Sequence, residues 1–142
     1  MTLGTVVIGC IAIFATQYTN NRRLGADIFL KYSDRISELR RRLPTVAILE
    51  SDESHVAEIT QEERRVAHEI IYAIFELFEL RVHGYFPSTI WKIREPDVEA
   101  LLSLPVFRQV MKALRGAFAR HPRFSTWVDG VTRASSFQSE LR

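Results

Sequence analysis

The sequence predicts an all-α protein, in which one N-terminal transmembrane helix continues into a cytoplasmic stalk helix that packs with a bundle of about four further helices. Three observations predict this architecture. The first 21 residues carry no charged side chain. Downstream, apolar residues recur every three or four positions, the spacing of one helix face, and no two segments show the alternation of a strand pair. The composition, 46% apolar and 25% charged, is ordinary for a globular chain.

Residues 1–21 are interpreted as a membrane anchor. The strictly apolar part is Leu3–Ala15, and the segment up to Tyr18 would measure about 25 Å as a helix, near the lower limit for crossing a bilayer. Arg22 and Arg23 flank it, so the positive-inside rule places the N-terminus outside and the C-terminal domain in the cytoplasm, as in a single-pass bacterial inner-membrane protein. The anchor residues are Leu3, Val6, Val7, Ile8, Ile11, Ile13, Phe14 and Tyr18.

Three alternatives to a membrane anchor stay open. A signal peptide is disfavoured because no positive charge precedes the apolar run. A lipoprotein anchor at Cys10 is disfavoured because the apolar stretch before it is short and the residues after it stay apolar. A helix buried in an oligomer core would also suit so short an apolar run. As the single cysteine, Cys10 excludes an internal disulfide and a cysteine-based zinc site.

Residues 22–43 are predicted to continue the same helix as an amphipathic stalk that stops before Pro44. One face carries apolar residues in steps of three or four, and positive charge in the last turn complements the helix dipole. This face needs a cover, which the chain's own bundle or a second copy would provide. The candidate partner face consists of Leu24, Ile28, Tyr32, Ile36 and Leu39.

Residues 44–59 form an acidic connector, and the predicted bundle domain occupies residues 60–133. Thr60 and Glu63 fit a capping box that opens a helix, and Gly84 is placed to end it. This helix is apolar on all but one stripe, so we expect neighbours to bury it on several sides. Arg81 lies on its apolar side and needs a partner or an exit to solvent.

The remaining chain is predicted to form shorter helices. Ser88 would cap a helix that Pro96 interrupts, and a second short piece would then end at Leu102. Ser103 would cap the next helix, with Pro105 in its first turn. A final helix would start at His121-Pro122 and end near Arg133, leaving residues 134–142 as a loose tail.

A polar stripe on the helix after Thr60 is the one candidate for metal or proton chemistry: Glu69, Glu76, Glu79 and His83. Glu79 and His83 have the i,i+4 spacing of metal ligands, but the Glu-x-x-His motif of di-iron bundles is absent. A solvated helix face is the favoured interpretation. No nucleophile elbow, phosphate-binding loop or zinc-protease motif occurs, so we expect no catalytic residue, cofactor or small-molecule substrate.

Arg108, Lys112 and Arg115 form a candidate basic patch, because their spacing puts them on one helix stripe. The patch is interpreted as a solvated face, with anionic lipid or an acidic protein as the alternative ligand. Nucleic acid is disfavoured, since the net charge is only +2 and no binding motif is present.

Three motifs resemble a group of uncharacterised bacterial proteins that have one N-terminal transmembrane helix and a small helical domain of unknown function. They are Trp91-Lys92-Ile93-x-Glu95, Leu104-Pro105-Val106-Phe107 and Phe118-Ala119-Arg120-His121-Pro122-x-Phe124-x-x-x-Val128-Asp129. The resemblance implies an all-helical, membrane-anchored protein and supplies no active site.

The expected function is therefore that of a non-enzymatic, membrane-anchored interaction or accessory subunit, which docks to or scaffolds a membrane protein assembly. Its partners would be the lipid bilayer and either another membrane protein or a second copy. The alternatives are a membrane-bound enzyme or metal protein that uses the acidic stripe, and an anionic-lipid-binding module that uses the basic patch.

Overall fold

The computed structural model describes residues 3–44, 59–85 and 87–140, with side chains at 12–44, 59–85 and 87–133. The helices are α1 (Leu3–Arg41), α3 (Gln61–Val82), α4 (Ser88–Leu102), α5 (Pro105–Leu114), the short 3₁₀ helix η2 (Ala117–Arg120) and α6 (Pro122–Glu140). No strand occurs in these ranges. The all-α prediction is confirmed.

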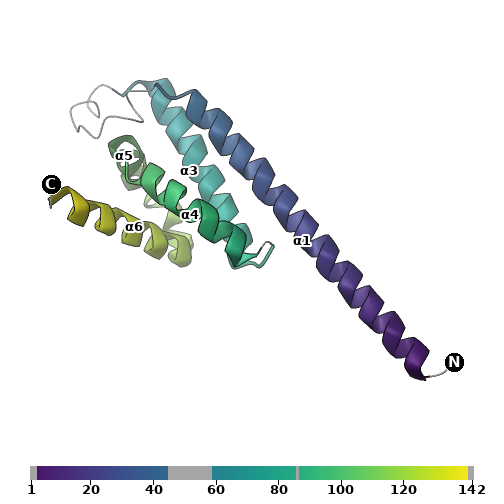
Figure 1. Cartoon of the computed structure of the whole chain (residues 1–142). Helices are drawn as coiled ribbons and strands as arrows, with labels where there is room; N and C mark the ends of the chain where they lie inside the picture. Colours follow the sequence, from purple (N-terminus) through teal and green to yellow (C-terminus); the bar gives the residue numbers. More distant parts are fainter. Residues whose placement is uncertain (1–2, 45–58, 86, 141–142) are drawn as a thin grey trace.

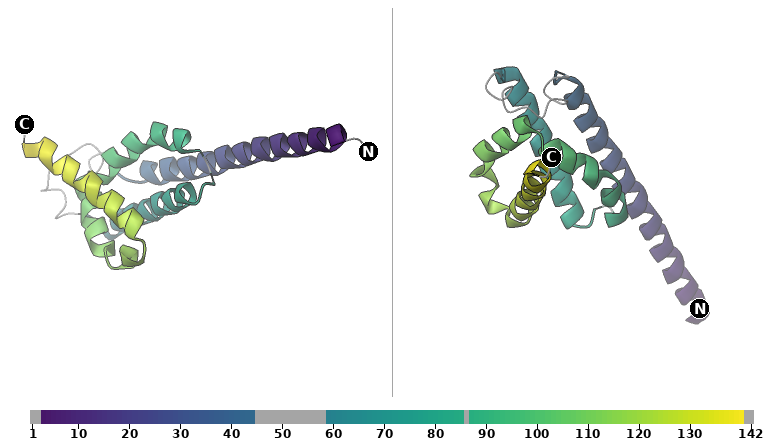
Figure 2. Two further views of the ribbon diagram at one scale, coloured as in Figure 1. Left: turned by 90° about the horizontal axis from the view of Figure 1, so that it is seen from below. Right: turned by 60° about the vertical axis from the view of Figure 1, so that its left-hand side comes forward.

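Helix α3 is the centre of the bundle. It packs against α1 on one side and against α4, α5 and α6 elsewhere on its circumference (Figure 1). The N-terminal half of α1 runs past the end of α3 and projects away from the other helices, as two further views also show (Figure 2). The bundle therefore packs only against the C-terminal half of α1.

Helix α1 is continuous and ends just before Pro44, as its apolar spacing predicted. At the end of the helix, the amide nitrogens of Arg42 and Leu43 donate to the carbonyl oxygens of Leu39 and Arg40. Arg40 and Arg41 stand in the last turn, where their charge complements the helix dipole.

The predicted capping box opens α3. The hydroxyl of Thr60 accepts a hydrogen bond from the amide of Glu63 at 3.2 Å, and the Glu63 carboxylate accepts one from the amide of Thr60 at 2.7 Å. At the other end, Gly84 adopts a φ of 77°. The amides of Gly84 and Tyr85 donate to the carbonyls of Arg81 and Leu80, so the helix closes with a Schellman motif.

The core forms where α3 meets the other helices. Its fully buried side chains include Ile70, Ile74 and Leu77 on α3. Phe124 on α6 is also fully buried and packs at ring distances of 5.0–5.4 Å against Phe118, Phe75 and Phe78. Apolar burial on several sides of α3 matches the expectation from its sequence.

Two predicted helix boundaries are wrong. Helix α4 runs from Ser88 to Leu102 through Pro96, and Pro87, not Ser88, occupies its N-cap position. A proline inside a helix removes one backbone hydrogen bond. Here Pro96 and Lys92, one turn earlier, are both exposed, so water can satisfy the freed carbonyl.

Ser103 also has a different role from the predicted one. Leu104 occupies the N-cap position of α5, and the Ser103 hydroxyl instead donates to the carbonyl of Ala100 at 2.6 Å. This bond helps to end α4, while Pro105 begins α5 as expected.

Helix α6 is longer than predicted. It continues to Glu140, so residues 134–140 are helical rather than a loose tail. No proline interrupts the chain after Pro122, and the one glycine there, Gly130, does not break the helix. The acidic connector lies outside the described residues except at Pro44 and Ile59.

Candidate binding sites

The candidate partner face on α1 divides into a covered and an uncovered part. Ile36 and Leu39 are buried against the bundle, and Tyr32 packs at the edge of the core. Ile28 is half-buried, whereas the side chain of Leu24 is 54% exposed. The chain's own bundle thus covers the C-terminal part of this face, and the N-terminal part stays open.

Polar contacts fix α1 along α3. Arg35 pairs with Glu76 at 3.5 Å and Arg42 pairs with Glu62 at 3.1 Å. Tyr32 is hydrogen-bonded to Glu76; burial, together with this bond and the carboxylate charge, raises the pKa of the Tyr32 hydroxyl above its ordinary value. These contacts hold the two helices in one register.

The part of α1 beyond the bundle exposes large apolar side chains. Ile13, Phe14 and Tyr18 are 60–72% exposed. The guanidinium of Arg22 lies over the Tyr18 ring, 5.2 Å from its centre. The other predicted anchor residues, Leu3, Val6, Val7, Ile8 and Ile11, belong to the same helix, and their side chains lie outside the described ones.

Within the described residues, no helix combines the length and the apolar character that a membrane crossing requires. The predicted transmembrane span therefore has no support from the structure.

The acidic stripe on α3 is engaged in ion pairs. Glu69 lies 4.0 Å from Arg65, and Glu76 pairs with Arg35 of α1. Glu79 lies between His83, at 3.6 Å, and His121 of η2's C-terminal end, at 3.9 Å. Among the described residues, no group of three or more His, Cys, Asp or Glu side chains is arranged to hold a metal ion. Of these contacts, those of Glu76 and Glu79 with Arg35 and His121 connect α3 to its neighbours.

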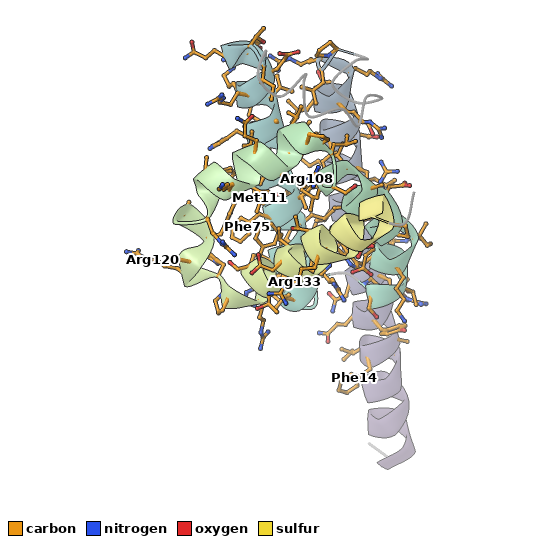
Figure 3. All side chains as sticks on the ribbon, turned by 90° about the vertical axis from the view of Figure 1, so that its left-hand side faces the viewer. Phe14, Phe75, Arg108, Met111, Arg120 and Arg133 are labelled. Carbon is orange, nitrogen blue, oxygen red and sulfur yellow. The ribbon has the colours of Figure 1, made fainter. Side chains whose placement is uncertain are left out.

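A groove between α5 and α6 contains the whole candidate basic patch. Its volume is about 410 Å³, and Arg108, Lys112 and Arg115 line it from the α5 side. Arg133 of α6 lines the opposite wall. Figure 3 shows Arg108, Met111 and Arg133 on the same face of the bundle, with Arg120 at its edge pointing away.

The floor of this groove is apolar. Leu102, Phe118 and Val128 are buried beneath it, and Met111 is half-buried at its side. The remaining wall is polar and includes Ser125, whose hydroxyl donates to the carbonyl of Phe118 at 2.9 Å. An apolar floor under a basic rim suits a ligand that has both an apolar and an anionic part.

The rim of the groove carries more positive than negative charge. Arg115 pairs with Asp129 across the groove at 3.4 Å. In the part of the chain that the structure describes, no carboxylate lies within ion-pair distance of Arg108, Lys112 or Arg133. Three cations at the rim therefore have no acidic partner within the described part of the chain.

Sequence reasoning identified the basic patch but missed the groove. Arg133 stands far from Arg108 in the sequence, and nothing in the local pattern of α6 shows that it faces α5. The apolar residues of the floor were predicted only to belong to the hydrophobic core. The one signal in the sequence for this wall of the groove was the i,i+4 spacing of Val128 and Thr132, next to Arg133, on a predicted helix.

Arg81 finds its partners inside the bundle. Its guanidinium lies 5.2 Å from the centre of the Trp91 ring and 5.9 Å from that of Phe78. It also lies 3.8 Å from the carboxylate of Glu95. Arg81 lies on the apolar side of α3 and therefore needed partners for its charge, which these contacts provide. Its role is structural.

Comparison with known proteins gives no match: no family model, no curated protein and no solved structure is similar to this chain. The resemblance seen in the Trp91, Leu104 and Phe118 motifs thus stays a prediction.

Proposed function

We propose that this protein is a non-enzymatic, membrane-anchored interaction subunit, in which the N-terminal part of α1 is the anchor and the bundle is held beside the membrane. The observation that carries the proposal is the projection of α1 beyond α3, with Ile13, Phe14 and Tyr18 exposed (Figure 2). A monomeric soluble protein rarely exposes such apolar side chains together unless they meet a membrane or a partner.

The chemistry of the projecting segment supports a lipid environment. It carries no charge before Arg22. The hydroxyls of Thr16 and Thr19 donate to the carbonyls of Ala12 and Ala15 at 2.8 and 2.9 Å, so their polar atoms already have partners within the helix. Internal hydrogen bonding of this kind lowers the cost of transfer into an apolar phase.

The junction between anchor and bundle supports an orienting role. Because α1 is one continuous helix through Arg23 and Ile36, the proposed anchor and the segment that packs on the bundle belong to the same helix. Ile36 and Leu39 are buried and Arg35 is paired with Glu76, so the bundle cannot swivel about α1 without losing these contacts. The anchor would then set the height and orientation of the bundle for a partner.

The uncovered face of α1 is where this partner would dock. About 18 residues make five helical turns, so Tyr18 lies on the same side of α1 as Ile36. This side is covered by α3 at Ile36 and open at Tyr18. Another membrane protein or a second copy of the chain would continue the packing that α3 begins.

Membrane fractionation tests the anchor. We expect the full chain to sediment with membranes and to resist alkaline carbonate extraction. Ile8→Lys should move it to the soluble fraction, because a charge near the centre of the apolar run Leu3–Ala15 costs about 3 kcal/mol on insertion. Asn20→Lys is the matched control, since it adds the same charge beside Arg22 and Arg23 and should leave the protein in the membrane.

The orientation is tested with single-cysteine variants. In a Cys10→Ser background, Ala113→Cys, at an exposed position of α5, should react with a membrane-impermeant maleimide only after the cells are opened.

Recovery of the unmodified chain as a monomer in the soluble fraction would overturn the proposal. A soluble oligomer that Ile8→Lys dissociates would instead identify the segment as a protein interface.

A further inference from the structure

We propose that the groove between α5 and α6 is a binding site for an amphipathic anion: a single alkyl chain with a phosphate or carboxylate headgroup. This site is separate from the anchor and does not depend on it.

The charges at the rim select an anionic headgroup. Arg108 and Lys112 on α5 and Arg133 on α6 line the groove and have no acidic partner among the described residues. The one carboxylate in the lining, Asp129, is engaged by Arg115 at 3.4 Å. Guanidinium groups bind phosphate and carboxylate oxygens through charge-assisted hydrogen bonds.

The floor of the groove selects an apolar tail. Leu102, Phe118 and Val128 present buried carbon surface, and Met111 adds a flexible side chain that adapts to an apolar ligand. The volume of about 410 Å³ lies within the range of small-ligand pockets, roughly 300–1,000 Å³. An alkyl chain fills such a space without leaving a polar group unpaired.

The position of the groove keeps it apart from the anchor. Helices α5 and α6 lie on the other side of α3 from α1 (Figure 1), and Phe14 lies well beyond the bundle (Figure 3). A free amphiphile and one acyl chain of an anionic bilayer lipid, together with its phosphate, share the required chemistry, so the experiment has one arm for each source.

The probes are hexyl, octyl and decyl phosphate, added to the full chain in phosphatidylcholine nanodiscs, with empty nanodiscs as the blank. Met111 lines the groove and is one of only 2 methionines, so its methyl NMR signal reports the site directly. We expect saturable shifts of this signal. Affinity should rise about fourfold for each added methylene that the groove buries.

Headgroup and tail are each tested by a matched probe. Inorganic phosphate and decyl trimethylammonium should leave the Met111 signal unmoved at the same concentrations. Equal binding of inorganic phosphate, or of the cationic amphiphile, would overturn the proposal, as would no shift with any alkyl phosphate. In nanodiscs containing phosphatidylglycerol, loss of decyl phosphate binding would identify bilayer lipid as the source, and unchanged binding would identify a free amphiphile.

Variants of the rim separate a built site from general surface charge. Arg108→Gln and Arg133→Gln should each weaken decyl phosphate binding about tenfold, the loss of one charge-assisted contact. Arg120→Gln is the control, because Arg120 is exposed and points away from the groove (Figure 3). Asp129→Asn should tighten binding, since it removes the negative charge of Asp129 from the rim and frees Arg115. Equal effects of the Arg120 and Arg108 variants would contradict the site.

Discussion

The indole nitrogen of Trp127 on α6 donates a hydrogen bond to the carboxylate of Glu95 on α4, with 3.2 Å between the two atoms. The same carboxylate oxygen lies 3.8 Å from the guanidinium of Arg81 on α3, so three helices meet at one side chain. Trp91 packs against both partners, with its ring 5.6 Å from that of Trp127.

Glu95→Ala should therefore destabilise the bundle by about 1–2 kcal/mol, because it leaves a donor of Trp127 and the charge of Arg81 without their acceptor. Glu95→Gln keeps an oxygen acceptor and should cost less. Urea unfolding followed by circular dichroism measures both. Asp97→Ala is the control: its pair with Arg94 is 65% exposed on the aspartate side and should contribute less than about 0.5 kcal/mol.

Substitution of Gly84 is predicted to destabilise the protein. Its φ of 77° lies in the left-handed region, so Gly84→Ala should destabilise the protein by about 1–2 kcal/mol even though nothing crowds the new methyl group. Gly116→Ala is the matched control, because a methyl group at Gly116 would also meet no neighbouring atom, whereas its φ of −65° is helical. It should be neutral or raise the free energy of unfolding by up to about 1 kcal/mol. Equal losses in the two variants would rule out the backbone explanation.

Truncation of Phe124 should be costly. It is fully buried, and its ring packs against those of Phe75, Phe78 and Phe118. Phe124→Ala should lower the free energy of unfolding by about 3–5 kcal/mol through lost transfer energy and a cavity. Ile93→Ala removes an apolar side chain that is 80% exposed and should change stability by less than about 0.5 kcal/mol. A thermal scan of both variants compares them.

Glu99 should make stability depend on pH. Burial, and secondarily the charge of Glu95, raises the pKa of the Glu99 carboxyl above 4.5. The folded state thus favours the protonated form, and the stability from this group is complete below the pKa of the unfolded chain and lost as pH rises through the folded pKa. Glu99→Gln should be more stable than the parent at pH 7, by less than about 1 kcal/mol because the group is partly exposed. The difference should vanish at pH 4; a difference that is constant with pH would contradict this.

Local signals in the sequence were enough to place α1 and α3. Thr60 and Glu63 form their capping box from residues three positions apart, and Gly84 ends α3 through its own backbone conformation. These interactions need no distant partner, so a local pattern predicts them. Pro96 shows what a local pattern cannot predict. Its effect on the helix depends on whether the carbonyl that it leaves without a hydrogen bond is exposed to water, and that depends on how the bundle folds.

The candidate sites were less predictable. Leu24 and Ile36 carry the same periodic signal, yet one is 54% exposed and the other 7%. Their difference comes from where α3 ends beside α1, and that is a property of two helices. Arg108 and Arg133 likewise meet at one groove only because Phe118 and Phe124 seat η2 and α6 against the core.

The sequence by itself determined the helical class, the limits of α1 and α3, and the charge-free character of the N-terminal segment, because periodicity, capping and charge act over a few residues. Only the tertiary structure decided which part of α1 the bundle covers, that Arg81 joins Glu95 and Trp91, and that basic side chains from two helices surround an apolar floor. Each of these depends on long-range packing, in which side chains distant in the sequence are brought together by the burial of a shared core.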